Sequence, residues 1–292
     1  MERSVEMDIP PAEAGEPIAT HHVRGGGGLR LDVREWGDPH GPAILLVHGW
    51  SQSQLCWARQ LESPFAGKFH IVTLDNRGHG MSEKPLGSEP YGDGRLWADD
   101  VAAVIEHTGL DRPVLVGWSY GGFIVADYVR AYGEAGIGGI NLVGGAVLLK
   151  PTFDHLGPGL LENAMDACAP DLLTNIAAIR RFLRACTAQP LSDEDWSTAL
   201  CWNMVVPAQV RGALISREID GDDVLSTLSV PVLVTHGRAD AIVLPSMAEH
   251  VLEVCGTAEP SWYDGVGHMP FWEGHERFNR ELGDFVVRVN DR

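Results

Sequence analysis

Residues 113 to 122 read PVLVGWSYGG, and this stretch decides the fold. Its first four residues are an apolar run typical of a buried strand. Gly117, Ser119 and Gly121 come next, and a helical pattern follows up to Tyr132. A sharp turn from strand to helix pushes its middle side chain outward and brings the residues two before and two after it against neighbouring backbone, where glycine fits best. The stretch therefore predicts a strand, a tight turn that exposes the Ser119 hydroxyl, and a helix.

The alternation of strand and helix continues on both sides of this stretch. Helical periods lie between short apolar runs, for example where Trp97, Val101 and Val104 share one face of a helix that ends at Gly109. Leu29 to Trp36 alternates apolar and polar residues, as an antiparallel strand does. Because strands alternating with helices need crossover connections, the pattern predicts an α/β fold with a mostly parallel, doubly wound sheet. Its buried strands are expected at Ala43–Val47, Ile71–Leu74, Pro113–Val116, Val143–Leu149 and Val230–Thr235.

One section interrupts the alternation. From Pro151 to Leu228 there is no strand pattern, and Ser192 with Asp195 is a candidate capping box for one of its helices. Ligands of open parallel sheets bind beyond the carboxyl ends of the strands, so helices inserted there would cover the site. We therefore expect a core domain formed by residues 1–150 and 229–292, and a helical lid formed by residues 151–228. One helical stripe of this lid consists of Leu172, Ile176, Ile179, Leu183 and Cys186.

Composition and charge argue against several classes of protein. The 292 residues include 22 Lys and Arg against 40 Asp and Glu, and the resulting charge of −18 repels phosphate, so neither nucleic acid nor an anionic membrane is expected as a partner. Five widely spaced cysteines without a Cys-x-x-Cys pair indicate neither a disulfide scaffold nor a zinc ribbon. The amino-terminal residues lack a secretory signal pattern, and no apolar run could span a bilayer. We expect a cytoplasmic protein that needs no metal or other cofactor; monomer and homo-oligomer stay open.

Two later motifs supply what a reactive serine needs. A serine hydroxyl is a weak nucleophile at neutral pH and requires a base that is oriented by an acid. Asp240 follows an apolar run, in a loop at its carboxyl end, and His268 comes just before the terminal helix. The chain order Ser119, Asp240, His268 is that of one known catalytic triad. Alone, Asp240 could be a helix cap and His268 a surface residue; Asp154 is the alternative acid.

The sequence also offers two backbone donors for an oxyanion. One donor must follow the nucleophile directly, and the other must come from the loop after an earlier strand. Tyr120 and Trp50, the last residue of a His-Gly-Trp motif, occupy these positions. The side chains of Trp50 and Tyr120, with Met269 and Phe271 after the histidine, are candidate substrate-binding residues. Packing beside the turn is the open alternative for Trp50 and Tyr120, and packing at the start of a helix is the open alternative for Phe271.

Together these motifs resemble the α/β-hydrolase superfamily. The match runs from about residue 29 to residue 290 except for the lid, and it is most similar to the cofactor-free haloperoxidases, perhydrolases and aryl esterases. The resemblance implies an α/β-hydrolase fold and a metal-free serine esterase. It also implies that His48 is a hydrogen-bonded strut beneath the oxyanion loop and that the turn at residues 75–82 is architectural. The stretches that carry it are HGW at 48–50, DNRGHGMS at 75–82, GWSYGG at 117–122, GRAD at 237–240 and GHMP at 267–270.

These observations predict a carboxylesterase that cleaves a moderately hydrophobic aryl ester, alkyl ester or lactone through an acyl-enzyme on Ser119. Haloalkane dehalogenases and epoxide hydrolases of this fold are excluded, because they need a carboxylate nucleophile. Carbon–carbon bond hydrolysis, amide hydrolysis and perhydrolysis by the same serine triad are alternatives. A small-molecule receptor that retains the fold is an alternative from another class, since a fold alone does not fix a function.

Overall fold

The computed structural model describes residues 15–149 and 153–291. Its centre is an eight-stranded sheet in the order β1-β2-β4-β3-β5-β6-β9-β10, with the last six strands parallel and β1 and β2 antiparallel at one edge. This confirms the mostly parallel, doubly wound sheet that the sequence predicts. The strands are β1 (Ala19–Arg24), β2 (Arg30–Gly37), β3 (Ala43–Val47), β4 (His70–Leu74), β5 (Val114–Trp118), β6 (Gly139–Val143), β9 (Val232–Gly237) and β10 (Ala258–Tyr263).

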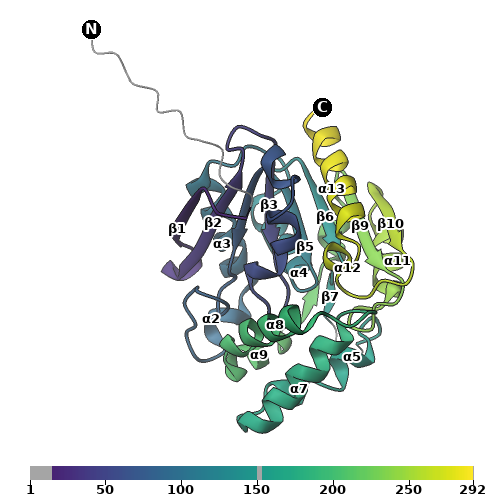
Figure 1. Ribbon diagram of the computed structural model, residues 1–292. Coiled ribbons are helices and arrows are strands. Elements are labelled where there is room, and N and C mark those ends of the chain that lie inside the picture. Colours follow the sequence, from purple (N-terminus) through teal and green to yellow (C-terminus); the bar gives the residue numbers. More distant parts are fainter. Residues whose placement is uncertain (1–14, 150–152, 292) are drawn as a thin grey trace.

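Helices cover both faces of the sheet. Helices α3 (Gly94–Thr108) and α4 (Gly121–Tyr132) pack together on one face, and α13 (His275–Asn290) lies on the other, with α11 (Pro245–Val254) beside β9 and β10 (Figure 1). Burial on both faces explains why the central strands are continuous apolar runs. The shorter helices of the core are η1 (Gly26–Gly28), η2 (Gln54–Trp57), α1 (Ala58–Leu61), η3 (Ala66–Lys68), α2 (Glu89–Gly92) and α12 (Pro270–Glu273).

Residues 153–228, here called the helical segment, lie between two strands of the core sheet. Figure 1 shows α7, α8 and α9 gathered at one end of the sheet. The Ser192 hydroxyl accepts a hydrogen bond from the Asp195 N–H (3.1 Å) at the start of α8, as the capping pattern predicts. The expected boundary at residues 150 and 151 lies outside the described residues. The elements of the segment are α5 (Pro158–Leu161), α6 (Ala164–Ala167), α7 (Leu172–Ala185), α8 (Asp193–Val205), α9 (Ala208–Ile215), β8 (Ile219–Asp220) and α10 (Asp222–Leu225).

Three sequence predictions about this region are wrong in detail. The strand expected at Val143–Leu149 is two elements, because β6 ends at Val143 and the chain turns at Gly144, which has a φ of 47°. The second element, β7 (Leu148–Leu149), pairs antiparallel with β8, so the helical segment does contain a short strand. Leu172 is 62% exposed at the start of α7 rather than part of a buried stripe. Turns at glycine and two-residue pairings leave little trace in hydrophobic periodicity.

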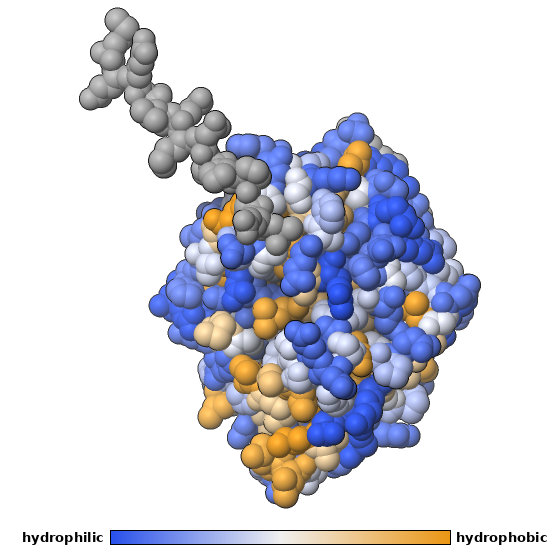
Figure 2. All heavy atoms as spheres, viewed as in Figure 1, coloured by the Kyte–Doolittle hydropathy of each residue, from blue (hydrophilic) through white to orange (hydrophobic). Residues whose placement is uncertain are grey.

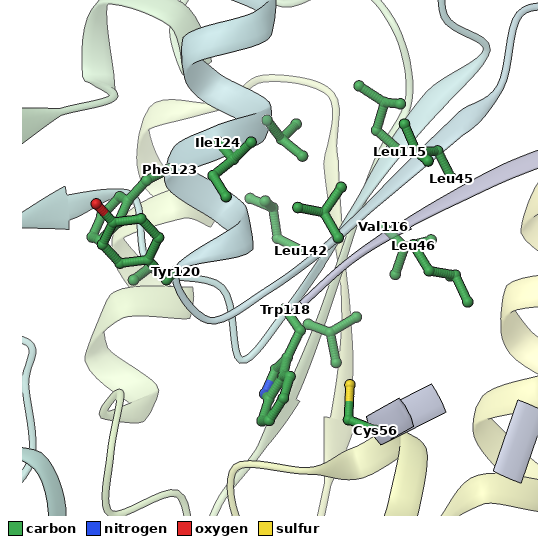
Figure 3. Packing of buried hydrophobic residues seen from close by; sticks show 14 of the residues in the cluster. Leu45, Leu46, Cys56, Leu115, Val116, Trp118, Tyr120, Phe123, Ile124 and Leu142 are labelled. Carbon is green, nitrogen blue, oxygen red and sulfur yellow. The ribbon is translucent and has the colours of Figure 1, made fainter. Parts of the chain in front are cut away.

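The turn after β5 separates two differently packed side chains. Trp118 and Tyr120 flank Ser119, and Figure 3 shows Tyr120 beside Phe123 at the start of α4, whereas Trp118 points away from that helix. The rings of Tyr120 and Phe123 lie 5.1 Å apart. Both flanking side chains are buried, so the turn is anchored on either side of the serine.

The surface is mostly hydrophilic, but apolar residues gather over the end of the molecule where α7 lies (Figure 2). The most exposed large apolar side chains of the helical segment are Met165, Leu172 and Leu173. Within the described residues, every helix is too short or too polar to cross a membrane.

Candidate active site

Ser119 lies at a sharp turn between β5 and α4. Its φ of 55° is in the left-handed region that residues other than glycine rarely adopt. The Ser119 N–H donates a hydrogen bond to the Val143 carbonyl (3.1 Å), which fixes the turn on β6. A Cβ at Gly117 would lie 2.7 Å from the Gly121 carbonyl oxygen, and a Cβ at Gly121 would lie 2.4 Å from that of Val47. Close backbone contacts therefore require both glycines, and the strained turn is of the kind found at functional sites.

Asp240 follows β9 and is held by the backbone of its own loop. Its Oδ1 atom accepts hydrogen bonds from the N–H groups of Ile242 (2.8 Å) and Val243 (3.0 Å). Its Oδ2 atom lies 2.7 Å from His268 Nδ1 and 3.3 Å from His236 Nε2. Burial alone would raise the pKa of Asp240, but the charge of His268 and hydrogen bonds from both imidazoles lower it to about 2. The carboxylate is therefore ionised at neutral pH.

His268 is fixed beside the serine turn. Its N–H donates to the Cys186 carbonyl (2.9 Å), and its own carbonyl accepts a hydrogen bond from Trp118 Nε1 (2.9 Å). Trp118 directly precedes Ser119, and its ring lies 5.6 Å from the imidazole. Because Nδ1 faces Asp240, only Nε2 can exchange a proton with a neighbour; Nε2 is buried and has no hydrogen-bond partner among the described residues. No hydrogen bond joins Nε2 to the Ser119 hydroxyl in this structure.

Two backbone N–H groups border the serine. Gly49 is so close that a Cβ there would lie 2.9 Å from the Ser119 Cβ, which brings the next residue, Trp50, alongside the serine. Tyr120 directly precedes α4, at the positive end of that helix. Within the described part of the chain, neither the Trp50 nor the Tyr120 N–H donates a hydrogen bond. Two unengaged donors at this position could stabilise negative charge next to Ser119.

A network of histidine contacts supports the loop that contains Trp50. His48 Nε2 accepts a hydrogen bond from the Asn76 N–H (3.0 Å), and its Nδ1 lies 2.8 Å from the Gly49 carbonyl oxygen. Burial lowers the pKa of His48, so its imidazole is neutral at pH 7. These contacts confirm the strut that the family resemblance implies.

A narrow apolar cavity opens next to Ser119. The volume within it that the centre of a water molecule can occupy is about 40 Å³. No charged side chain of the described residues lines this cavity. The helical segment contributes Phe182, whose ring meets that of Trp50 edge-on at 5.2 Å. Since one water needs roughly 10 to 15 Å³ by this measure, the cavity suits an apolar group of a few carbon atoms. Its walls are Trp50, Ser119, Tyr120, Phe123, Ala146, Leu149, Leu156, Leu160, Phe182, Ile215, Ile242 and Val243.

The structure brings some candidate residues to this cavity and places others elsewhere. Trp50 and Tyr120 line the cavity, but Met269 and Phe271 do not. The Phe271 ring is fully buried, 4.9 Å from that of Trp118, so the packing alternative describes it. Asp154, the alternative acid, is exposed and makes no contact with the imidazole that Asp240 holds.

Sequence reasoning missed two buried side chains near the site. His236, at the end of β9, contacts the same carboxylate oxygen as His268. Arg211, in α9, is only 1% exposed and donates a hydrogen bond to Ser51 Oγ (2.9 Å) in the loop after β3. A single arginine in a short helix normally indicates a solvated face, so its sequence position gives no sign of burial.

Comparisons with known proteins agree with this fold. Residues 44–281 match the model of the alpha/beta hydrolase family. A bifunctional esterase/perhydrolase from Acinetobacter calcoaceticus is 28% identical over 272 residues, covering 89% of this chain and 96% of its own. The structure of a candidate aryl esterase from Burkholderia cenocepacia is 37% identical with a TM-score of 0.90, covering 94% of this chain and all of the other. An esterase from Rhodococcus sp. ECU1013 is 30% identical with a TM-score of 0.88, covering 93% of this chain and all of the other. The chain belongs to the alpha/beta hydrolase family.

Proposed function

We propose that this hydrolase is a serine carboxylesterase in which Ser119, His268 and Asp240 form the catalytic triad. The observation that carries the proposal is the 2.7 Å contact between Asp240 Oδ2 and His268 Nδ1, made beside a strained serine. It leaves His268 Nε2 as the only ring nitrogen available for proton transfer. The esterases that are similar along most of the chain support the same activity.

In the acylation step, Ser119 Oγ attacks the ester carbonyl carbon while its proton passes to His268 Nε2. A rotation of the serine side chain closes this hydrogen bond, which is often loose in enzymes without substrate. Asp240, ionised at neutral pH, stabilises the imidazolium that forms. The negative carbonyl oxygen receives hydrogen bonds from the N–H groups of Trp50 and Tyr120. Collapse of this intermediate expels the alcohol, which takes the proton from His268 and leaves an acyl group on Ser119.

In the second step, water replaces the alcohol. His268 Nε2 removes a proton from the water, whose oxygen attacks the acyl carbon, and the same two N–H groups stabilise the second oxyanion. The bond to Ser119 Oγ breaks, the serine regains its proton and the carboxylic acid leaves. Every proton taken up by His268 is returned within the cycle, so no cofactor is needed.

The cavity next to Ser119 supports a short, uncharged acyl group as the preferred substrate part. Its walls are mostly apolar, and Phe182 is one of the residues that the helical segment contributes to them. We therefore propose that residues 153–228 act as the lid of the site, and that the substrate is a moderately hydrophobic ester of a short acid. An anionic acyl group would lose its hydration without finding a partner there.

The experiment is hydrolysis of p-nitrophenyl acetate by wild type and by Ser119→Ala. The variant should lose at least about 10⁴-fold in kcat, because the triad acts as a unit. Wild-type-like turnover by folded Ser119→Ala would contradict the assignment.

A fluorophosphonate probe distinguishes an enzyme from a small-molecule receptor. Rapid labelling of Ser119 supports the esterase proposal, and tight binding of a small ligand without labelling contradicts it.

A further inference from the structure

Three consecutive side chains of the loop after β3 bind the helical segment. Trp50 Nε1 donates a hydrogen bond to the Arg211 carbonyl (3.1 Å). Ser51 Oγ accepts one from Arg211 Nε (2.9 Å). Gln52 Oε1 accepts one from Trp202 Nε1 (2.8 Å). This loop supplies one of the two proposed oxyanion donors, so its conformation depends on contacts with α8 and α9 as well as on the core.

Ser51 is the most constrained residue of the three. Its φ of 61° is left-handed, and its side chain is fully buried. The Ser51 N–H donates to His79 Nε2 (3.1 Å) on the core side, while its Oγ is bound by Arg211 from the other side. A residue in this backbone region persists only where its surroundings determine it. Because Ser51 directly follows Trp50, the two anchors also fix the peptide group that carries the Trp50 N–H.

Arg211 is unusual among the buried charges of the protein. Its remaining hydrogen bonds go to neutral acceptors, namely the Ala167 carbonyl (2.8 Å), Asn175 Oδ1 (2.8 Å) and the Asn203 carbonyl (2.7 Å). In the described part of the chain, no carboxylate forms an ion pair with it. By contrast, two other buried arginines are paired: Arg77 with Asp100 at 2.6 Å and Arg217 with Asp127 at 2.7 Å. An unpaired buried guanidinium costs folding free energy, and well-packed apolar residues would fill the same space without that cost.

We propose that Arg211 is a positioning residue that couples the helical segment to the oxyanion loop. The guanidinium binds polar groups of α6, α7 and α8, and its Nε binds the Ser51 hydroxyl. The packing of these helices therefore determines the orientation of the Trp50 N–H. This inference rests on the proposed esterase function. It requires that Arg211 act on kcat, through the transition state, rather than on substrate affinity.

The test uses Arg211→Met, which keeps the apolar length but removes the donors, and Ser51→Gly, which removes the hydroxyl and suits the positive φ. Both variants should hydrolyse p-nitrophenyl acetate with a kcat reduced about 10- to 100-fold and a KM changed less than about 3-fold. The expected loss of kcat is smaller than the loss caused by removing an oxyanion donor outright. The double variant should be no slower than the slower single variant, because both remove the same contact.

Binding of a trifluoromethyl ketone adds a readout that a purely structural role would not change. Ser119 Oγ adds to its electrophilic keto carbon while the serine proton passes to His268, and the tetrahedral hemiketal resembles the transition state, so its affinity should fall in parallel with kcat/KM in both variants. Arg181→Met is the matched control, since the Arg181 side chain in α7 is 50% exposed and, among the described residues, binds Asn163 and Asp166 and no part of the loop after β3. This control should keep wild-type kcat and inhibitor affinity.

Each outcome decides the inference. Folded Arg211→Met and Ser51→Gly with unchanged kcat, or with a loss confined to KM, would overturn it. If Arg211→Met does not fold, Ser51→Gly decides alone, because this substitution relieves backbone strain. Ser119→Ala tests the esterase proposal separately. If that variant loses turnover while the Arg211 and Ser51 variants keep a normal kcat, the enzyme assignment is supported and the positioning role is refuted.

Discussion

His268 Nδ1 lies 2.7 Å from Asp240 Oδ2, and both side chains are excluded from solvent. The pair joins the loop after β9 to the loop after β10, two segments that the parallel sheet places side by side. A Cβ at Gly144 would lie 3.0 Å from His268 Nδ1, so the turn that ends β6 also has to be glycine for the pair to form.

Asp240→Asn should abolish most activity without unfolding the protein. An amide in this position no longer stabilises the imidazolium and favours the wrong tautomer, so kcat should fall about 10⁴-fold. Steady-state hydrolysis of p-nitrophenyl acetate measures this loss. Asp154→Asn is the matched control, because Asp154 is exposed and His268 Nδ1 is hydrogen-bonded to Asp240 instead. A greater loss in this variant than in Asp240→Asn would reverse the assignment of the acid.

Acid should destabilise the protein through His79. Burial, followed by the charge of His48, lowers the pKa of His79 to about 3. The unfolded chain, with an ordinary histidine pKa of about 6.5, binds a proton first as the pH falls. The contribution of His79 to stability is therefore complete above about pH 6.5 and is lost progressively towards pH 3, at about 1.4 kcal/mol per pH unit.

Urea unfolding between pH 4 and 6.5 tests this linkage. His79→Gln should make the free energy of unfolding less dependent on pH across this range than it is in wild type. The exposed His40 is the control position, and His40→Gln should change the slope little. An equal slope in wild type and His79→Gln would show that His79 is not the buried neutral group described here.

Phe182→Ala should shift substrate preference towards longer acyl chains. The ring lines the cavity beside Ser119 and meets Trp50, so its removal extends the space available to the acyl group. The ratio of kcat/KM for p-nitrophenyl hexanoate to that for the acetate should rise about 10-fold, the effect of a few methylene groups in an apolar pocket. Leu183→Ala, a buried neighbour in α7 outside the cavity, should lower the Tm and leave this ratio unchanged.

Gly121→Ala should prevent correct folding of the serine turn. The added methyl group would lie 2.4 Å from the Val47 carbonyl oxygen, and both atoms belong to rigid backbone. We expect a Tm lowered by about 2 to 12 °C, or insoluble protein, since a forced backbone shift costs about 1 to 3 kcal/mol and each kcal/mol lowers the Tm of a protein of this size by about 2 to 4 °C. A Cβ at Gly67 meets nothing within 4 Å, so thermal unfolding of Gly67→Ala should match wild type.

The sequence predicts most of the core and the turn that holds Ser119, because both depend on local patterns. Apolar runs mark strands that are buried on both faces, and the glycines at 117 and 121 reflect contacts that any serine turn of this kind makes. Asp240 is predictable for a related reason, since it follows an apolar run that forms β9, whereas the strand before His268, β10, is not among the strands that the sequence predicts.

What the sequence does not predict depends on long-range packing. Phe271 follows the histidine by three residues and suggests a pocket wall, yet its ring packs into an aromatic cluster with Trp57 and Trp118. Arg211 carries no local signal, because its role arises only when α9 meets Ser51, 160 positions away in the chain. The break of the expected strand at Gly144 likewise serves His268, a residue far along the sequence.

The central claim is that Ser119 becomes acylated during turnover, with His268 as its base. Rapid acid quench during hydrolysis of p-nitrophenyl acetate, followed by peptide mass spectrometry, tests this directly. We predict one acetyl group on the peptide that contains Ser119 in wild type, and none in Ser119→Ala or in His268→Ala. Turnover in wild type without an acetylated Ser119 peptide, or full activity in folded His268→Ala, would contradict the account.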